Sequence, residues 1–138
     1  MQTSPIILID DDQDDLDLIK EAIRESGIEN EIITFQDSSE ALAFLTFSNK
    51  HHLFILCDIN MPGMNGFDLR ESLIRDGTVL LKSIPFIFVS TAENPIHVKR
   101  AYELQVQGYF KKPVSYKETL LFIKNVAWYW NACSHPNK

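Results

Sequence analysis

Hydrophobic residues gather in five short runs, and segments with helical spacing separate these runs along the chain. The runs occupy residues 6–9, 32–35, 53–57, 85–89 and 108–110. Their length and their content of β-branched and aromatic residues are typical of buried strands. Between the first two runs, Leu16, Ile19 and Ile23 repeat at helical spacing and Gly27 supplies a stop, which predicts an amphipathic helix.

Further helices are predicted after each of the later strands. Asp37 stands in capping position before the second helix, a loop rich in glycine precedes a third helix near Phe67, and Asn94 before Pro95 begins a fourth. A fifth helix is expected over about residues 115–130. Strands that alternate with helices pair in parallel, because each helix carries the chain back across the sheet. We therefore predict an α/β fold with a doubly wound parallel sheet.

Length and composition limit the possible classes of protein. The 138 residues, of which 45% are hydrophobic and 23% charged, predict one globular domain over residues 1–138, with a core over about residues 5–131 and no output domain. The net charge of −6 disfavours binding to nucleic acid, which depends on basic residues. No apolar run approaches the length of a membrane span, and the start of the chain lacks the pattern of a secretory signal, so we expect a cytoplasmic protein.

Polar residues suited to catalysis or metal binding follow the predicted strands at their carboxyl ends. Asp10 and Asp11 end the first strand, Asp58 the third and Ser90 the fourth, and Lys112 follows the fifth. Ligand sites of open α/β sheets form at this edge, so these side chains should share one crevice. Carboxylates that lie close together repel one another and raise their own pKa values unless a cation neutralises them. Oxygen ligands of this kind suit Mg²⁺. With a lysine and a hydroxyl beside them, they indicate a site that handles phosphoryl groups.

Nearly the whole chain resembles the receiver domains of bacterial two-component response regulators, in particular the single-domain, CheY-like members. The resemblance is carried by Ile9-Asp10-Asp11, Asp58-Ile59-Asn60-Met61-Pro62 with Gly66, Ser90, and Lys112-Pro113. The motifs occur in the family's order and spacing. The resemblance implies a flavodoxin-like (βα)5 fold whose five strands lie in the order 2-1-3-4-5.

The resemblance also implies a role for each site residue. Asp58 is expected to accept the phosphoryl group. Asp11, Asp58 and the main-chain carbonyl of Asn60 would bind Mg²⁺, and Asp10 would act through a coordinated water. Lys112 would pair with the Asp58 carboxylate and later with the phosphoryl oxygens.

Four more positions take expectations from the family. Ser90 would donate its hydroxyl to the phosphoryl group, and Tyr109 matches the switch aromatic that turns inward when that hydroxyl moves. Pro113 occupies a position that is typically a cis-proline. Ser90 replaces the more frequent threonine, and Thr91 stands where a smaller residue is usual, so access to the phosphoryl group could be narrowed.

The function implied is that of a signalling switch rather than an enzyme. A histidine kinase or a histidine phosphotransfer protein would donate the phosphoryl group, and catalysis would be limited to self-phosphorylation and self-dephosphorylation. The output would be contact with an unknown downstream protein, with a possible homodimer through the fourth helix, fifth strand and fifth helix. The alternatives are a small Mg²⁺-dependent phosphohydrolase that forms an aspartyl phosphate, and a binding module that needs no phosphorylation.

Other polar and aromatic residues are interpreted without a chemical role. The acids Asp12, Asp14, Asp15 and Asp17 are interpreted as the solvated start of a helix. His51, His52, His97 and His135 lack metal-binding spacing and are expected at the surface. Cys57 and Cys133 are expected to be reduced, with Cys57 in the core. Trp128, Tyr129 and Trp130 cannot all face one side of a helix, so at least one should lie near the surface.

Overall fold

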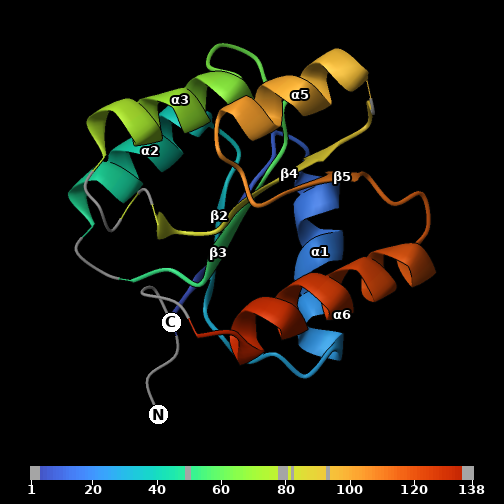
Figure 1. The fold of residues 1–138 in the computed structure, drawn as a ribbon. Coiled ribbons are helices and arrows are strands. Elements are labelled where there is room, and N and C mark those ends of the chain that lie inside the picture. The colour runs from blue at the N-terminus through green and yellow to red at the C-terminus, as the bar shows by residue number, and fades with distance from the viewer. Residues whose placement is uncertain (1–3, 49–50, 78–80, 82, 93, 135–138) are drawn as a thin grey trace.

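The protein folds around a parallel five-stranded sheet (Figure 1). The computed structural model describes residues 4–48, 51–77, 81, 83–92 and 94–134. Its strands are β1 (Ile6–Ile9), β2 (Ile32–Phe35), β3 (Phe54–Cys57), β4 (Phe86–Ser90) and β5 (Gly108–Lys111). They lie in the order β2-β1-β3-β4-β5, which confirms the predicted flavodoxin-like topology.

Helices cover both faces of the sheet. They are α1 (Gln13–Glu25), α2 (Ser38–Phe47), α3 (Gly66–Asp76), α5 (Pro95–Glu103) and α6 (Tyr116–Ala132). Figure 1 shows α2, α3 and α5 on one face, and α1 and α6 on the other. Each helix begins after a residue whose side chain accepts a hydrogen bond from a backbone N–H of the first turn, at Asp12, Asp37, Asn65, Asn94 and Ser115.

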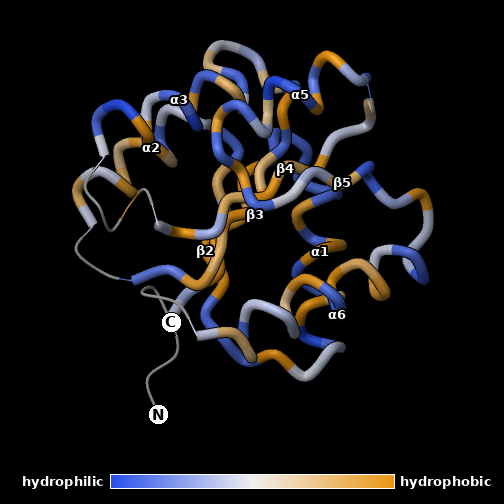
Figure 2. Tube along the Cα trace, viewed as in Figure 1, coloured by the Kyte–Doolittle hydropathy of each residue, from blue (hydrophilic) through white to orange (hydrophobic). Residues whose placement is uncertain are grey.

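Strands β1 to β4 each contribute to two hydrophobic cores, because successive side chains point to opposite faces of the sheet. In β1, Ile7 and Ile9 belong to the core beneath α2, α3 and α5, whereas Ile6 and Leu8 belong to the core beneath α1 and α6. The central strands β1 and β3 are therefore apolar along their whole length, whereas the edge strand β5 is mixed (Figure 2). This accounts for the continuous hydrophobic runs of the sequence.

One prediction about the histidines is wrong. His52 is 0% exposed, and its ring lies edge-on to that of Phe44 in α2 with the ring centroids 5.8 Å apart. The chain is already beneath α2 at this point, one residue before the buried Leu53. His51 is exposed as expected and His97 is partly buried. His135 lies outside the described residues.

The cysteines and the aromatic residues of α6 agree with their predictions. Both cysteines are free, and Cys57 packs in the core beneath α2, α3 and α5. Trp128 and Tyr129 are exposed, whereas Trp130 packs against the core beneath α1 and α6. Among the described residues, no helix combines the length and the hydropathy that crossing a membrane requires.

Candidate functional site

The carboxyl ends of β1 and β3 lie next to each other at the centre of the sheet. Asp10 follows β1 directly and Asp58 follows β3 directly. The Asp58 amide donates to the carbonyl of Ile9 at 2.9 Å, and the Asp10 amide donates to the carbonyl of Phe35 at 3.0 Å. The ladder of parallel hydrogen bonds therefore continues through both aspartates and fixes them side by side.

Three carboxylates form a compact cluster at this edge. Asp10, Asp11 and Asp58 each offer an oxygen, and these oxygens all lie within 4.8 Å of one another. Asp10 is 4% and Asp58 6% exposed, whereas Asp11 faces solvent. Oxygen ligands at this spacing, two of them withdrawn from water, fit a hard divalent cation such as Mg²⁺.

Burial dominates the electrostatics of the cluster. It raises the pKa of Asp58 from its ordinary 3.8 to about 6; Lys112 opposes this increase, and the charges of Asp10 and Asp11 add to it. The pKa of Asp10 is also raised, first by burial, against a hydrogen bond from the Asp12 amide and the attraction of Lys112. The cluster thus holds more negative charge than its surroundings stabilise, which favours a bound cation.

Lys112 brings a positive charge to three carboxylates. Its Nζ lies 2.9 Å from Asp10 Oδ2, 2.8 Å from Asp15 Oδ2 and 3.6 Å from Asp58 Oδ2. Together these acids raise the pKa of Lys112 despite the opposing effect of its burial. The expected pairing with Asp58 is therefore the longest of the three contacts.

Asp15 is the residue of this site that the sequence analysis missed. We had interpreted it as part of a solvated helix start, yet its carboxylate accepts a hydrogen bond from Lys112, 97 residues later in the chain. Asp15 lies in the first turn of α1, where acidic residues are common because they interact favourably with the helix dipole. No local pattern marked it out, and it becomes part of the site only because the chain after β5 brings Lys112 nearby.

The loop between β3 and α3 holds Asp58 in place. Asp58 Oδ1 accepts a hydrogen bond from the Ile59 amide at 2.9 Å, and the Ile59 carbonyl accepts from the Gly66 amide at 2.9 Å. A Cβ on Gly66 would lie 2.5 Å from the Asp58 carbonyl oxygen and 2.9 Å from the Ile59 Cα. Glycine is thus required where α3 approaches the loop. Asn60 is exposed within this loop, two residues beyond Asp58.

Ser90 and Tyr109 both bind the loop after β4. Ser90 is fully buried, and its Oγ accepts a hydrogen bond from the Ala92 amide at 3.3 Å. The Tyr109 hydroxyl donates to the Ala92 carbonyl at 2.6 Å, and its ring lies edge-on to Phe88. Because a hydroxyl that accepts one bond keeps its proton for another acceptor, Ser90 retains a donor.

The expected cis-proline is absent. The Lys112–Pro113 peptide bond is trans, as are all peptide bonds among the described residues. The trans form is the more stable isomer of an X–Pro bond, although by only about 0.5–1 kcal/mol. Lys112 keeps its place beside β4 in this arrangement, since its amide donates to the Ser90 carbonyl at 2.7 Å.

Comparison with known families identifies the domain. The sequence profile described as "Response regulator receiver domain" matches residues 6–124. The chain belongs to this family. The predicted resemblance is therefore confirmed, and with it the assignment of the chain as a receiver domain of the response-regulator signalling family.

Individual relatives agree with the family match. Response regulator Rcp1 of Synechocystis sp. is 28% identical over 130 residues, which cover 91% of this chain and 87% of Rcp1. The crystal structure of the phosphorylated cyanobacterial phytochrome response regulator RcpA has a TM-score of 0.87 at 27% identity, covering 98% and 99% of the two chains. The Mn²⁺-bound form of Rcp1 has a TM-score of 0.84 at 26% identity, covering 97% and 99%.

Longer relatives also match this receiver domain. Response regulator SaeR of Staphylococcus aureus is 30% identical over 121 residues, which cover 88% of this chain. The chain spans about half the length of SaeR, 49%. The shared part is thus the receiver portion of a longer protein.

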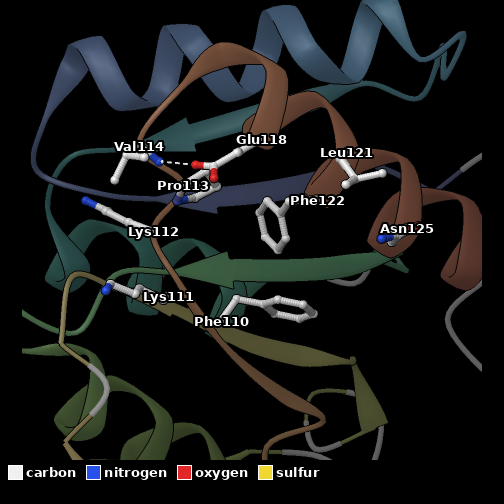
Figure 3. Close-up of a pocket in the computed structure, with 9 residues that line it drawn as sticks. All are labelled: Phe110, Lys111, Lys112, Pro113, Val114, Glu118, Leu121, Phe122 and Asn125. Atoms are coloured by element: carbon white, nitrogen blue, oxygen red, sulfur yellow. Dashed lines mark hydrogen bonds between the residues drawn. The ribbon is translucent and has the colours of Figure 1, made fainter.

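The receiver domain has an apolar hollow on the surface formed by β5, the loop after it, and α6 (Figure 3). Its volume is about 450 Å³, and the apolar residues that line it include Phe110, Val114, Leu121 and Phe122. Figure 3 shows the side chain of Lys112 directed away from the rings of Phe110 and Phe122. Lys112 therefore separates the charged crevice from this apolar surface.

Proposed function

We propose that Asp58 accepts a phosphoryl group from a phosphohistidine donor. The observation that carries the proposal is the cluster itself: oxygens of Asp10, Asp11 and Asp58 lie within 4.8 Å of one another, and an ammonium lies 3.6 Å from Asp58 Oδ2. In the transfer, a carboxylate oxygen of Asp58 bonds to phosphorus as the phosphorus–nitrogen bond of the donor breaks. The nitrogen keeps the electron pair, and the product is an acyl phosphate.

The acids of the cluster would hold the metal ion. We propose that Asp11, Asp58 and the main-chain carbonyl of Asn60 bind Mg²⁺ directly and that Asp10 acts through a water molecule. The relative Rcp1 has been crystallised with Mn²⁺, and the structure of RcpA is of the phosphorylated protein. When bound, Mg²⁺ supplies positive charge for the oxygens of the transferring group.

Lys112 and Ser90 would stabilise the phosphoryl group on Asp58. The ammonium of Lys112 offers a positive charge from the side of β5, and the hydroxyl of Ser90 offers a hydrogen bond from the end of β4. Both residues are linked along the backbone, since the Lys112 amide donates to the Ser90 carbonyl. Movement of one of these residues would therefore displace the other.

The changed surface would lie on α5, β5 and α6. If Ser90 turns toward the phosphoryl group, the Ala92 amide loses its acceptor and the loop after β4 would shift, and because the Ala92 carbonyl accepts from the Tyr109 hydroxyl, this shift would change how far Tyr109 turns inward. Exposed apolar side chains lie beside this region, at Phe110, Val114, Leu121, Trp128 and Tyr129. We propose that a downstream protein, or a second copy of the chain, contacts this surface, and that nucleic acid does not.

Phosphorylation of the intact chain tests the proposal. Wild type and Asp58→Asn are incubated with Mg²⁺ and acetyl phosphate, and intact mass is measured. Wild type should gain one phosphoryl group and Asp58→Asn none. Asp17→Asn, which changes an exposed acid of α1, is the matched control and should be phosphorylated like wild type. An unmodified wild type, or a modified Asp58→Asn, would contradict the proposal.

The same samples address the enzymatic alternative. We propose that catalysis is confined to the domain's own phosphorylation and dephosphorylation. Steady release of phosphate from p-nitrophenyl phosphate by wild type, lost in Asp58→Asn, would show instead that the protein is a phosphohydrolase.

A further inference from the structure

The ammonium of Lys112 is shared unequally among its neighbours. Its Nζ is at hydrogen-bonding distance from Asp15 at 2.8 Å and from Asp10 at 2.9 Å, whereas Asp58 Oδ2 is 3.6 Å away. An ammonium has three N–H donors. Two of them are directed to carboxylates other than that of the proposed phosphoacceptor.

Asp15 is held where it binds Lys112. It lies in the first turn of α1, and the side chain of Asp12 fixes this turn by accepting hydrogen bonds from the amides of Asp14 and Asp15. The Asp15 side chain is 36% exposed and that of Lys112 15%, so the pair is partly withdrawn from water. Asp15, Lys112 and Thr91 line the same open hollow of about 620 Å³ above the cluster. The carboxylate of Asp15 therefore stands at the mouth of the crevice.

We infer that Asp15 is a positioning residue that holds the Lys112 ammonium on the α1 side of the crevice and competes for it with a phosphoryl group on Asp58. This inference rests on the proposed phosphorylation of Asp58. A phosphoryl group adds negative charge and acceptor oxygens at Asp58. Lys112 then turns toward these oxygens, and its bond to Asp15 is weakened or broken. Asp15 thereby lowers the stability of the phosphorylated state.

Binding of beryllium trifluoride tests the competition at equilibrium. This anion is a tetrahedral analogue of a phosphoryl group on a carboxylate, and its affinity in the presence of Mg²⁺ can be measured by calorimetry. Asp15→Asn should bind it about three- to tenfold more tightly than wild type, the range that a partly buried ion pair allows. Asp14→Asn removes the same charge from the same helical turn, where Asp14 is exposed. It should change the affinity by less than about twofold, because exposed charges are screened.

A double-mutant cycle shows whether the effect passes through Lys112. In a Lys112→Met background, Asp15→Asn should alter the affinity by less than about twofold, since no ammonium remains for which Asp15 and the bound anion compete. A crystal structure of metal-free Asp15→Asn gives a readout that is independent of binding. The distance from Lys112 Nζ to Asp58 Oδ2 should shorten from 3.6 Å to about 2.8 Å, the length of a charge-assisted hydrogen bond.

The outcomes separate this inference from the proposed function. If wild type binds beryllium trifluoride but Asp15→Asn behaves like Asp14→Asn, the role of Asp15 is refuted and the phosphoacceptor site stands. An effect of Asp15→Asn that persists with Lys112→Met also refutes it, because the mechanism would then be general electrostatics. If wild type binds no beryllium trifluoride and gains no phosphoryl group, the proposed function itself is refuted.

Discussion

Two parts of the protein bury charged groups, and they stabilise those charges differently. At the carboxyl ends of β1 and β3, Asp10 and Asp58 are buried beside the single ammonium of Lys112. Between α3 and the turn before β5, Arg70 is 1% exposed. Its guanidinium donates to the carbonyls of Leu104 and Gln105 at 2.9 and 2.7 Å and lies over the ring of Phe86, 5.1 Å from its centroid.

The difference indicates which buried charge serves function. The partners of Arg70 are neutral dipoles fixed by the backbone, and although burial lowers the pKa of Arg70 to about 10, it remains charged near neutral pH. It therefore acts as a permanent clamp on the turn. The acids at the strand ends outnumber the positive charge beside them, and burial, with a smaller contribution from the charges of Asp10 and Asp11, raises the pKa of Asp58 to about 6 although Lys112 lowers it. Such a site changes when a cation or a phosphoryl group arrives.

The largest expected effect is on stability and comes from removing the clamp. Arg70→Ala leaves the carbonyls of Leu104 and Gln105 without their donor and opens a cavity over Phe86, which should cost about 3 kcal/mol of unfolding free energy. Arg75→Ala, on the same helix but with exposed ion pairs to Glu71 and Asp76, should cost less than about 0.5 kcal/mol. Urea unfolding monitored by circular dichroism gives both values.

A volume-conserving variant separates packing from hydrogen bonding at this position. Arg70→Met fills most of the space but donates to neither carbonyl, so its loss should lie between those of Arg70→Ala and wild type. The fraction of each Arg70 variant that remains folded should still be phosphorylated on Asp58. Equal stability of Arg70→Ala and wild type would show that the clamp contributes nothing.

The second effect has the opposite sign. Without a divalent cation, Asp58→Asn should stabilise the protein at pH 7 by about 1–2 kcal/mol, because it removes a carboxylate that the fold buries unfavourably. The pKa of Asp58 is higher in the folded protein, about 6, than its ordinary 3.8. The folded state thus binds this proton more tightly, and wild-type stability falls as pH rises from about 4 to about 6.

The pH dependence provides the check. Urea unfolding in a chelating buffer should show the advantage of Asp58→Asn in full above about pH 6 and its disappearance below about pH 4. Asp17→Asn, at an exposed position of α1, should change stability by less than about 0.5 kcal/mol at either pH. If Asp58→Asn were less stable than wild type at pH 7, the carboxylate would be stabilising the fold and the contrast with Arg70 would fail.

The sequence predicted the strands and the acids at their ends because both follow from local patterns. Each buried parallel strand is a continuous apolar run, and the first polar residue after it marks the edge of the sheet, as Asp10 and Asp58 do. The order of the strands required the family resemblance as well. No local pattern distinguishes one sequence of parallel neighbours from another.

The contacts that the sequence did not predict depend on tertiary packing. Asp15 looks like any acid in the first turn of a helix, and only the approach of Lys112 from β5 makes it part of the site. Arg70 belongs to no sequence motif. Its role depends on the turn at Gln105, whose backbone φ of 60° is unusual for a residue other than glycine. His52 was predicted at the surface together with the other histidines, because none of them has metal-binding spacing, yet its side chain is buried beneath α2.

The smallest expected effect lies at the rim of the site, where a change should alter a rate and leave stability unchanged. Thr91 is exposed and lines the hollow above the acids with Lys112. Thr91→Ala widens that opening, so water should reach the phosphoryl group more easily and the acyl phosphate should hydrolyse about two- to fivefold faster. Intact mass followed over time after removal of acetyl phosphate gives the lifetime. Thr46→Ala, an equal change at an exposed position of α2, should leave it as in wild type.

The direction of this last change decides how the rim acts. Both threonine variants should unfold within about 0.5 kcal/mol of wild type, as is usual for exposed positions. A faster loss of phosphate in Thr91→Ala alone would then show that the Thr91 side chain shields the acyl phosphate from water. An unchanged or longer lifetime would mean that the opening does not limit hydrolysis. The charged groups beneath it, foremost Lys112 and the acids that share it, would then set the rate.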